Sequence, residues 1–339
     1  MLALDAMGGD LAPAVTVEGA LRAHRERGLQ VLLVGDEQRL KIELRRLGAG
    51  ETELRVHHAS EVVEMDEQPG QALRKKKDSS LKVCFDLVAA KEVDGMVSAG
   101  NSGAVLAGGL FVLGRLDGVD RPCIGGSLPT VKGRAVLVDM GANVECTPEQ
   151  IVQFALMGEV YARKVLGVAR PKVGVVANGE EEGKGTDLTR KAAAALRLDP
   201  EIEFRGYVEG KDVFSGDFDV IATDGFTGNV LLKTAEGAVW AFGQMLKRQI
   251  QSSTVASAGA LLLGPALEQV RKRVDYEEIG GAPLLGVHGV AMLAHGRSTA
   301  RAILNALSAA ELFAQKQLEE DLTAAARRGA TLFTQRAAS

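Results

Sequence analysis

Continuous apolar runs of four to six residues recur along this chain, and each is followed by a stretch with the spacing of an amphipathic helix. Strands that are apolar on both faces belong to a parallel sheet covered by helices on both sides, because a strand with one wet face alternates apolar and polar residues. The strand and helix segments follow each other as 29–34 and 36–47, 95–98 and 102–113, 135–139 and 148–166, 172–177 and 186–196, and 218–223 and a helix from about 227. The pattern predicts an α/β protein with three layers, in which a mainly parallel sheet lies between two layers of helices.

No linker or low-complexity segment divides the chain, and 339 residues with 46% apolar side chains suffice for one large core. We therefore expect a single α/β/α domain over residues 1–339. Residues 122–133, rich in Gly and Pro, predict a turn or hairpin that interrupts the alternation. Residues 238–276 form a long helical pattern with two glycines and a proline between 259 and 265, which predicts a projecting helical hairpin.

Charge and cysteine usage exclude several classes of function. A net charge of −4 and a pI near 5.9 argue against a nucleic-acid binder, which presents a basic surface. The cysteines Cys84, Cys123 and Cys146 have neither the spacing of a zinc site nor that of a disulfide framework, so we expect no metal and a reducing compartment. The first residues lack a secretory signal pattern, and polar side chains interrupt the uncharged stretch 249–267, which excludes a transmembrane span there.

Glycine-rich and asparagine-rich motifs follow most of the expected strands. The first strand runs into Asp5, the pair Gly8 and Gly9, and Asp10, a turn in which residues without Cβ let an anion approach backbone N–H groups. Open α/β sheets bind their ligands at the carboxyl ends of the strands, so these motifs predict one binding rim. The further motifs lie at 98–104, 139–143, 178–185, 208–210, 214–216, 223–229, 280–286 and 294–296.

These motifs, in this order and over nearly the whole chain, resemble the bacterial acyl-ACP:phosphate acyltransferase family of phospholipid synthesis. The resemblance implies a fold similar to phosphotransacetylases and isopropylmalate dehydrogenases, and transfer of a fatty acyl group from an acyl-ACP thioester to inorganic phosphate. It also implies a homodimer without cofactor, in the cytoplasm and peripherally associated with the inner face of the membrane. The partners implied are acyl carrier protein and a downstream membrane acyltransferase that receives the acyl phosphate.

Phosphate is itself an anionic nucleophile, so the implied reaction needs hydrogen-bond donors and positive charge rather than a side-chain nucleophile. The absence of a G-x-S-x-G elbow agrees with this requirement. Residues 179–185 resemble a P-loop only superficially, since their glycine spacing is one residue short and Gly185 stands where Ser or Thr would meet magnesium. The expected catalytic residues are Asn101, Ser102, Asn143, Lys184, Asp224 and Asn229.

A second set of residues is expected to bind substrate through backbone N–H groups or acidic and imidazole side chains. For each loop taken alone, an ordinary turn or helix cap explains the same residues, and Asp10 beside Pro13 fits a cap. Because several such loops share one expected rim, binding is favoured over simple turns for the set. For Lys184, the resemblance favours a positive donor over a solvated lysine. The expected substrate-binding residues are Asp5, Gly8, Gly9, Asp10, Gly100, Gly103, Gly141, Gly183, Gly225, Gly228 and His295.

Two basic runs stand out in this acidic chain. The runs Arg74, Lys75, Lys76 and Lys77, and Arg271, Lys272 and Arg273, could steer an acidic carrier protein by long-range attraction. The alternative is an ordinary solvated helix face. Beside the second run, the expected membrane contacts are Leu261, Leu262, Leu263 and Leu267, for which a dimer interface is the alternative.

Other functions remain open at this stage. A phosphotransacylase that uses acyl-CoA has the same fold expectation, and fold alone does not choose between the two carriers. A metal- and NAD-dependent dehydrogenase is disfavoured, because no G-x-G-x-x-G follows the first strand. A non-catalytic scaffold that binds acyl carriers at the membrane is the alternative from another class.

Overall fold

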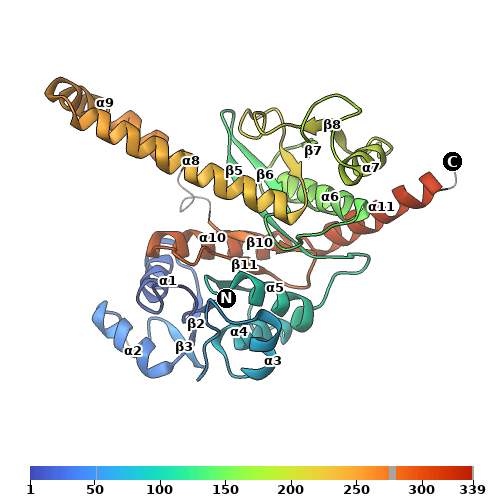
Figure 1. Cartoon of the computed structure of the whole chain (residues 1–339). Coiled ribbons are helices and arrows are strands. Elements are labelled where there is room, and N and C mark those ends of the chain that lie inside the picture. The colour runs from blue at the N-terminus through green and yellow to red at the C-terminus, as the bar shows by residue number, and fades with distance from the viewer. Residues whose placement is uncertain (51, 275–279, 338–339) are drawn as a thin grey trace.

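The computed structural model describes residues 1–50, 52–274 and 280–337, and in this part of the chain one sheet of eleven strands carries the fold (Figure 1). The strand order is β3-β2-β1-β4-β11-β10-β5-β6-β9-β7-β8. The strands are β1 Leu2–Asp5, β2 Val31–Gly35, β3 Arg55–His58, β4 Gly95–Ser98, β5 Cys123–Pro129, β6 Arg134–Val138, β7 Lys172–Val176, β8 Glu203–Val208, β9 Val220–Ala222, β10 Ala282–Leu285 and β11 Ala291–Leu293. The helices are α1 Ala14–Arg27, α2 Glu37–Arg46, α3 Pro69–Lys75, α4 Ser80–Ala89, α5 Ser102–Gly108, the π-helix η1 Gly109–Leu113, α6 Pro148–Lys164, α7 Asp187–Leu196, α8 Gly225–Gln251, α9 Thr254–Val274, α10 Ala300–Lys316 and α11 Glu319–Ala337.

The sheet consists of two parallel halves joined by antiparallel strands. The first half is β3-β2-β1-β4-β11, and the second is β6-β9-β7-β8. Strand β10 pairs antiparallel with β11 through Ala282 and Pro283 and with β5 through Leu284 and Leu285. The antiparallel hairpin of β5 and β6 confirms the interruption expected at residues 122–133.

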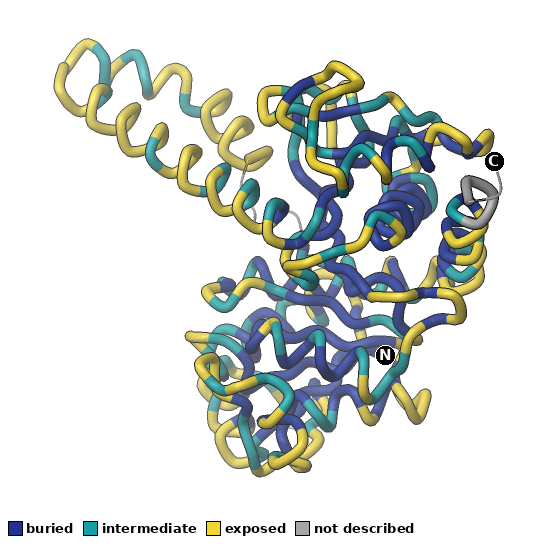
Figure 2. The backbone as a smooth tube through the Cα atoms, turned by 45° about the vertical axis from the view of Figure 1, so that its right-hand side comes forward, coloured by how far each residue is buried: buried dark blue, intermediate teal, exposed yellow. Residues whose placement is uncertain are grey.

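Helices cover both faces of the sheet, as the continuous apolar strands predict. In β1, Leu2 and Leu4 pack into the core that α1 and α10 close, whereas Ala3 faces the core of α4. In the second half, α6 and α7 lie on one face and the start of α8 lies on the other. Figure 2 shows the strands and α6 as buried backbone inside this cover.

Local sequence signals set the helix ends. Thr147 and Gln150 form a reciprocal capping box at the start of α6, with Pro148 in the first turn. Helix α1 ends at Gly28, whose φ of 69° is the left-handed conformation that glycine adopts at no steric cost.

Helices α8 and α9 form the projecting hairpin that the sequence predicts (Figure 1). The turn lies at residues 252–253. The expected break at Gly259, Gly264 and Pro265 is wrong, because α9 continues through all three residues. Most side chains of the hairpin are exposed in the single chain (Figure 2). Residues 275 and 276, the last of the expected segment, lie outside the described residues. No helix within the described ranges combines the length and apolarity needed to cross a membrane.

The first turn of α8 packs directly against the loop after β6. A Cβ at Gly225 would lie 2.6 Å from the Asn143 carbonyl oxygen, and one at Gly228 would lie 1.9 Å from the Asp139 carbonyl oxygen. Only glycine permits this approach of helix and backbone. The helix leaves the sheet from this contact and carries its next turns past the ends of the central strands (Figure 1).

Substituting Gly228→Ala is expected to lower the free energy of unfolding by about 2–4 kcal/mol, because the new methyl group meets backbone rather than a movable side chain. Urea unfolding measures this change. The matched control is Gly237→Ala on the same helix, where a Cβ meets nothing within 4 Å and alanine gains up to about 1 kcal/mol of helix propensity. Equal effects of the two substitutions would show that the contact does not constrain α8.

Candidate active site

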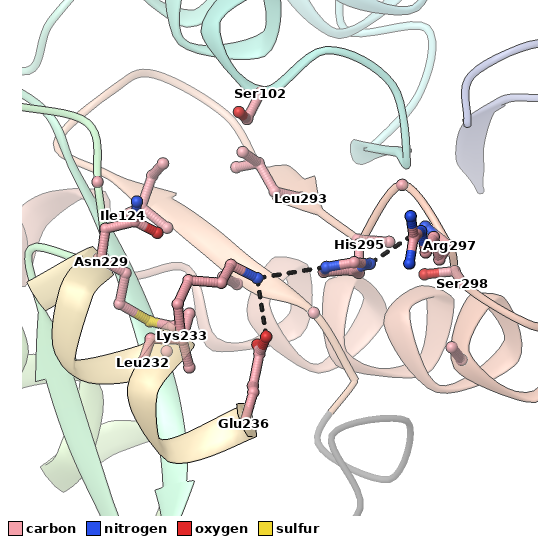
Figure 3. Close-up of a pocket in the computed structure, with 18 of the residues that line it drawn as sticks. Ser102, Ile124, Asn229, Leu232, Lys233, Glu236, Leu293, His295, Arg297 and Ser298 are labelled. Atoms are coloured by element: carbon pink, nitrogen blue, oxygen red, sulfur yellow. Dashed lines mark hydrogen bonds and ion pairs between the residues drawn. The ribbon is translucent and has the colours of Figure 1, made fainter. Parts of the chain in front are cut away.

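A cavity of about 470 Å³ lies where the two halves of the sheet meet (Figure 3). The first half contributes residues that follow the carboxyl ends of its strands: Asp10 after β1, Ser102 after β4 and His295 after β11. The second half contributes Gly141 after β6 and Asn229 on α8, which follows β9. The cavity therefore lies at strand ends, where the motif positions predict a binding rim.

One wall of the cavity carries polar and charged side chains. The Lys233 ammonium lies 2.9 Å from a Glu236 carboxylate oxygen one turn further on α8, and 3.3 Å from Nε2 of His295 (Figure 3). The backbone N–H of Arg297 donates to Nδ1 of His295 at 3.1 Å. The Arg297 guanidinium lies 3.7 Å from Asp10, so two cations border the same opening.

This arrangement favours a neutral imidazole. Partial burial lowers the pKa of His295, and the neighbouring Lys233 ammonium lowers the pKa further, while Glu236 acts in the opposite direction. Because Nδ1 accepts the Arg297 N–H, the proton of the neutral ring is assigned to Nε2. The Lys233 ammonium and the His295 ring then lie side by side on this wall, and a positive charge beside an imidazole attracts an anionic oxygen.

Ser298 adds a hydroxyl group to this wall. Its side chain is 2% exposed, it belongs to the cavity lining, and within the described ranges its Oγ has no hydrogen-bond partner. The Ser298 N–H donates to the His295 carbonyl, which fixes the turn between β11 and α10. Buried hydroxyl groups are nearly always hydrogen-bonded, so an unpaired one beside a cavity indicates a place for a polar ligand atom.

Six of the residues expected from the sequence line the cavity: Asp10, Gly100, Ser102, Gly141, Asn229 and His295. Ser102 is the first residue of α5, and Asn229 lies in the first two turns of α8. Both side chains are exposed to solvent at the lining.

Three other expected catalytic residues are not in the lining. The side chains of Asn101, Asn143 and Asp224 form hydrogen bonds within the loops and helix ends beside it. The Asn101 oxygen caps α5 at Ala104, and its amide donates to the carbonyls of Met65 and Glu67 at 3.0 Å each. The Asn143 amide donates to Asp139 and to the Pro122 carbonyl. Asp224 caps α8 by accepting from the backbone and hydroxyl of Thr227.

The motif after β1, with Asp5, Gly8 and Gly9, also lies outside the lining and stabilises the loops beside it. Asp5 is buried under the cavity floor and accepts hydrogen bonds from Ser80 at 2.6 Å and Ser98 at 2.7 Å, and burial raises its pKa. A Cβ at Gly8 would lie 2.4 Å from the Asp5 carboxylate, and Gly9 has a φ of 108°. Of the remaining expected glycines, Gly103 packs against Pro69, and Gly225 and Gly228 admit α8.

Lys184 and Gly183 lie in the exposed loop before α7 and do not belong to the lining. Near this loop, the carboxylates of Glu180, Glu209 and Asp212 come within 4.8 Å of one another, a spacing that can hold a metal ion. Lys211 forms ion pairs with Glu180 and Glu209, and its ammonium balances much of their charge. This cluster therefore fits an ion-paired surface group.

Sequence reasoning missed Lys233, Glu236, Arg297 and Ser298. The signal was present for the first two, because positions 229, 233 and 236 fall on one helix face when the helix begins near 225. An i,i+3 pair of Lys and Glu is so common on solvated helices that its sequence alone does not mark a site.

Nearly the whole chain is similar in sequence to a known protein family. A family model described as fatty acid synthesis protein matches residues 1–321. The phosphate acyltransferase of Anaeromyxobacter sp. strain Fw109-5 is 56% identical, over 96% of this chain and 90% of that protein. The phosphate acyltransferase of Myxococcus xanthus is 54% identical, over 95% of this chain and 92% of that protein.

Solved structures show the same fold at much lower identity. A phosphotransacetylase from Streptococcus pyogenes matches with a TM-score of 0.59 and 17% identity, over 92% of this chain and 93% of that chain. A branched-chain phosphotransacylase from Enterococcus faecalis matches with a TM-score of 0.57 and 14% identity, over 93% and 99%. These matches, together with the sheet, confirm the α/β fold of phosphotransacetylase type that the sequence predicts.

The electrostatics of the polar wall can be tested by NMR titration of the His295 ring. Its pKa is expected below the usual value for histidine, because partial burial disfavours the charged ring and protonation places a second cation beside Lys233. Lys233→Met should raise this pKa, and Glu236→Gln should lower it, since each removes a charge of opposite sign. Shifts of the same sign in both variants would contradict the arrangement.

Proposed function

Because this chain belongs to the family of phosphate acyltransferase enzymes, we propose that it transfers a fatty acyl group from an acyl-ACP thioester to inorganic phosphate. The products are an acyl phosphate and the free carrier thiol. The observation that supports this reaction best is the convergence of Lys233, His295 and Arg297 on one wall of a cavity whose other wall is apolar. Such a cavity suits an anion beside a hydrocarbon.

In the proposed reaction, a phosphate oxygen attacks the thioester carbonyl carbon, a carbon–oxygen bond forms, and the carbon–sulfur bond breaks. The sulfur leaves as a thiolate that takes up a proton. In this proposal, Lys233 and the His295 ring hold the anionic phosphate beside the carbonyl carbon of the neutral thioester. In the proposal, the Ser298 hydroxyl, which lacks a hydrogen-bond partner among the described residues, donates to a phosphate oxygen.

Negative charge develops on the thioester oxygen during the attack. Ser102 and Asn229 have exposed polar side chains in the lining, on α5 and α8, and serve in this proposal as donors to that oxygen. Asn101 and Asp224 cap these two helices and therefore act as positioning residues. Lys184 remains a predicted donor in a neighbouring loop.

The proposed carrier protein docks on the first basic run. Arg74, Lys75 and Lys77 are exposed, whereas Lys76 is tied to Glu67 and to the Val62 carbonyl. Their helix α3 packs on α5, where Pro69 lies against Gly103, next to the lining residue Ser102. The helix that carries the start of the run thus contacts an element of the cavity lining, and in this proposal the exposed cations attract an acidic carrier.

The hairpin supports the proposed homodimer and membrane contact. Trp240, Phe242 and Met245 on α8 are about two-thirds exposed, and Leu261, Leu262, Leu263 and Leu267 on α9 are exposed as well. Arg271, Lys272 and Arg273 follow these leucines. In the proposal, a second copy covers the apolar face of α8, and the cation-flanked leucines meet the anionic membrane that receives the acyl phosphate.

Lys233→Met is expected to lower kcat/KM for phosphate about 100-fold, because it removes the main positive charge at the attacking oxygen. Phosphate-dependent thiol release from acyl-ACP measures the change. The matched control is Lys41→Met on α2, a lysine also paired with a glutamate of its own helix, at 2.6 Å. Full activity of Lys233→Met together with loss in Lys184→Met would move the phosphate site to the loop before α7. No thiol release by the unaltered protein would favour the scaffold.

Replacing Arg74, Lys75 and Lys77 together by Gln is expected to raise KM for acyl-ACP about 10-fold at low salt and leave kcat unchanged. Turnover of an acyl-CoA should stay as in the unaltered chain if carrier protein is the true partner. The comparison variant replaces Arg271, Lys272 and Arg273 by Gln. A raised KM in the comparison variant alone would place the carrier on α9 instead.

A further inference from the structure

We propose that Met65 makes the site select phosphate over water as the acceptor of the acyl group, and that Asn101 is the positioning residue that holds Met65 over the site. The proposal rests on the proposed acyl transfer and adds a selectivity to it. It concerns residues 59–68, which connect β3 to α3 and which we call the crossing loop.

The crossing loop runs past the carboxyl ends of the first half of the sheet. At its start, the Ala59 N–H donates to the Gly35 carbonyl at the end of β2, at 2.9 Å. Further along the loop, Met65 contacts Gly296 in the turn after β11. Strands β1 and β4 lie between β2 and β11 in the sheet, so the loop passes the ends of both. It thereby reaches from the edge of this half to the cavity.

The side chain of Met65 lies on Gly296. A Cβ at this glycine would be 2.9 Å from Cε of Met65, 3.7 Å from an Asp10 carboxylate oxygen and 3.8 Å from the Ala99 carbonyl oxygen. The loops after β1, β4 and β11 therefore meet at one point, and the apolar end of Met65 covers it. Met65 belongs to the cavity lining, and its exposed fraction is 45%, so more than half of its surface contacts the protein.

Asn101 fixes the crossing loop to α5. Its side-chain amide donates to the carbonyls of Met65 and Glu67 at 3.0 Å each, and the Glu64 carbonyl lies at 3.5 Å. Its side-chain oxygen accepts the Ala104 N–H in the first turn of α5. Asn101 is 9% exposed, so these hydrogen bonds are shielded from water. One side chain thus fixes the backbone of Met65 relative to the start of α5.

Lys76 fixes the same loop independently. Its ammonium lies 2.6 Å from the Val62 carbonyl oxygen and forms an ion pair with Glu67. Residues 62 and 67 stand on either side of Met65 in the sequence, so the backbone that carries the methionine is held at both ends. These contacts distinguish Met65 from an ordinary exposed methionine.

The cover matters because water can replace phosphate in the proposed reaction. A water oxygen attacks the same thioester carbon, a carbon–oxygen bond forms, and the carbon–sulfur bond breaks. The sulfur leaves as a thiolate that takes one proton of the water, and the product is a fatty acid instead of an acyl phosphate. Closing a site against water suppresses such side reactions. Met65 covers the glycine between His295 and Arg297, which border the proposed anion, and so excludes water at that place.

The test compares thiol release from acyl-ACP with saturating phosphate and without phosphate. Met65→Ala should raise the ratio of phosphate-independent to phosphate-dependent release about tenfold, because water gains access to the site. Met65→Leu is the matched control, since leucine provides an apolar cover of similar volume, and it should keep the ratio within about threefold of the unaltered chain. An unchanged ratio in Met65→Ala, or an equal rise in both variants, would overturn the proposal.

Asn101→Asp tests the positioning role. An aspartate oxygen still accepts the Ala104 N–H and keeps the cap of α5, but the donor to the crossing loop is lost. The ratio should rise as in Met65→Ala, and the double variant should rise no further, because both changes remove one cover. Thermal unfolding identifies a variant that does not fold, and the two Met65 variants then decide the proposal alone. An unchanged ratio in folded Asn101→Asp would overturn the role of Asn101.

Failure of the proposed function would appear differently, as no thiol release by the unaltered chain even with phosphate. The cover is then tested by NMR titration of His295, whose pKa is lowered chiefly by partial burial. Removing the methionine from Gly296 hydrates the neighbouring ring, so Met65→Ala should raise this pKa and Met65→Leu should leave it unchanged. The charged groups around the ring are the same in all three proteins: Lys233, Glu236, Arg297 and Asp10. Equal pKa values in the unaltered chain and Met65→Ala would overturn the cover.

Discussion

The buried carboxylate of Asp139 holds together the part of the cavity that the second half of the sheet contributes. It accepts five hydrogen bonds, from the backbone N–H groups of Ile124, Gly141, Ala142 and Asn143 and from the Asn143 amide. Burial raises its pKa, and the donors from Ala142, Ile124 and Asn143 act in the opposite direction by stabilising the charged form. One side chain thereby joins β5 to the turn after β6, and the Asn143 carbonyl then receives the Gly225 N–H of α8.

This chain of contacts explains why a long helix can serve a site at strand ends. The glycines of its first turn let α8 approach the β6 loop, and its axis then carries Asn229, Lys233 and Glu236 along the opening. The first half supplies the turn from His295 to Ser298, which is tied to Asp10 through the Gly296 carbonyl. The proposed anion site therefore lies where the two halves of the sheet meet, and each half contributes one member of the pair Lys233 and His295.

Much of the fold was readable from the sequence because continuous apolar strands and glycine at strand ends are local signals. The same signals marked strand ends that border one cavity, which is lined by Asp10, Ser102, Asn229 and His295. The sequence did not show which polar side chains face the cavity and which form structural hydrogen bonds. Whether Asn101 or Asn143 faces a ligand depends on partners 34 and 21 residues away, at Glu67 and Pro122. Lys233 could not be recognised because the sequence of an exposed helical lysine does not indicate that the lysine contacts His295, 62 residues further along the chain.

The central claim is that phosphate binds between the two halves, against Lys233 and His295. A crystal structure of the full chain with bound phosphate tests it most directly. The account predicts phosphate oxygens within hydrogen-bond distance of Lys233 Nζ, His295 Nε2 and Ser298 Oγ, with the anion facing the apolar wall across the cavity. Phosphate bound instead in the loop of Lys184, with the Lys233 wall left to solvent, would contradict it.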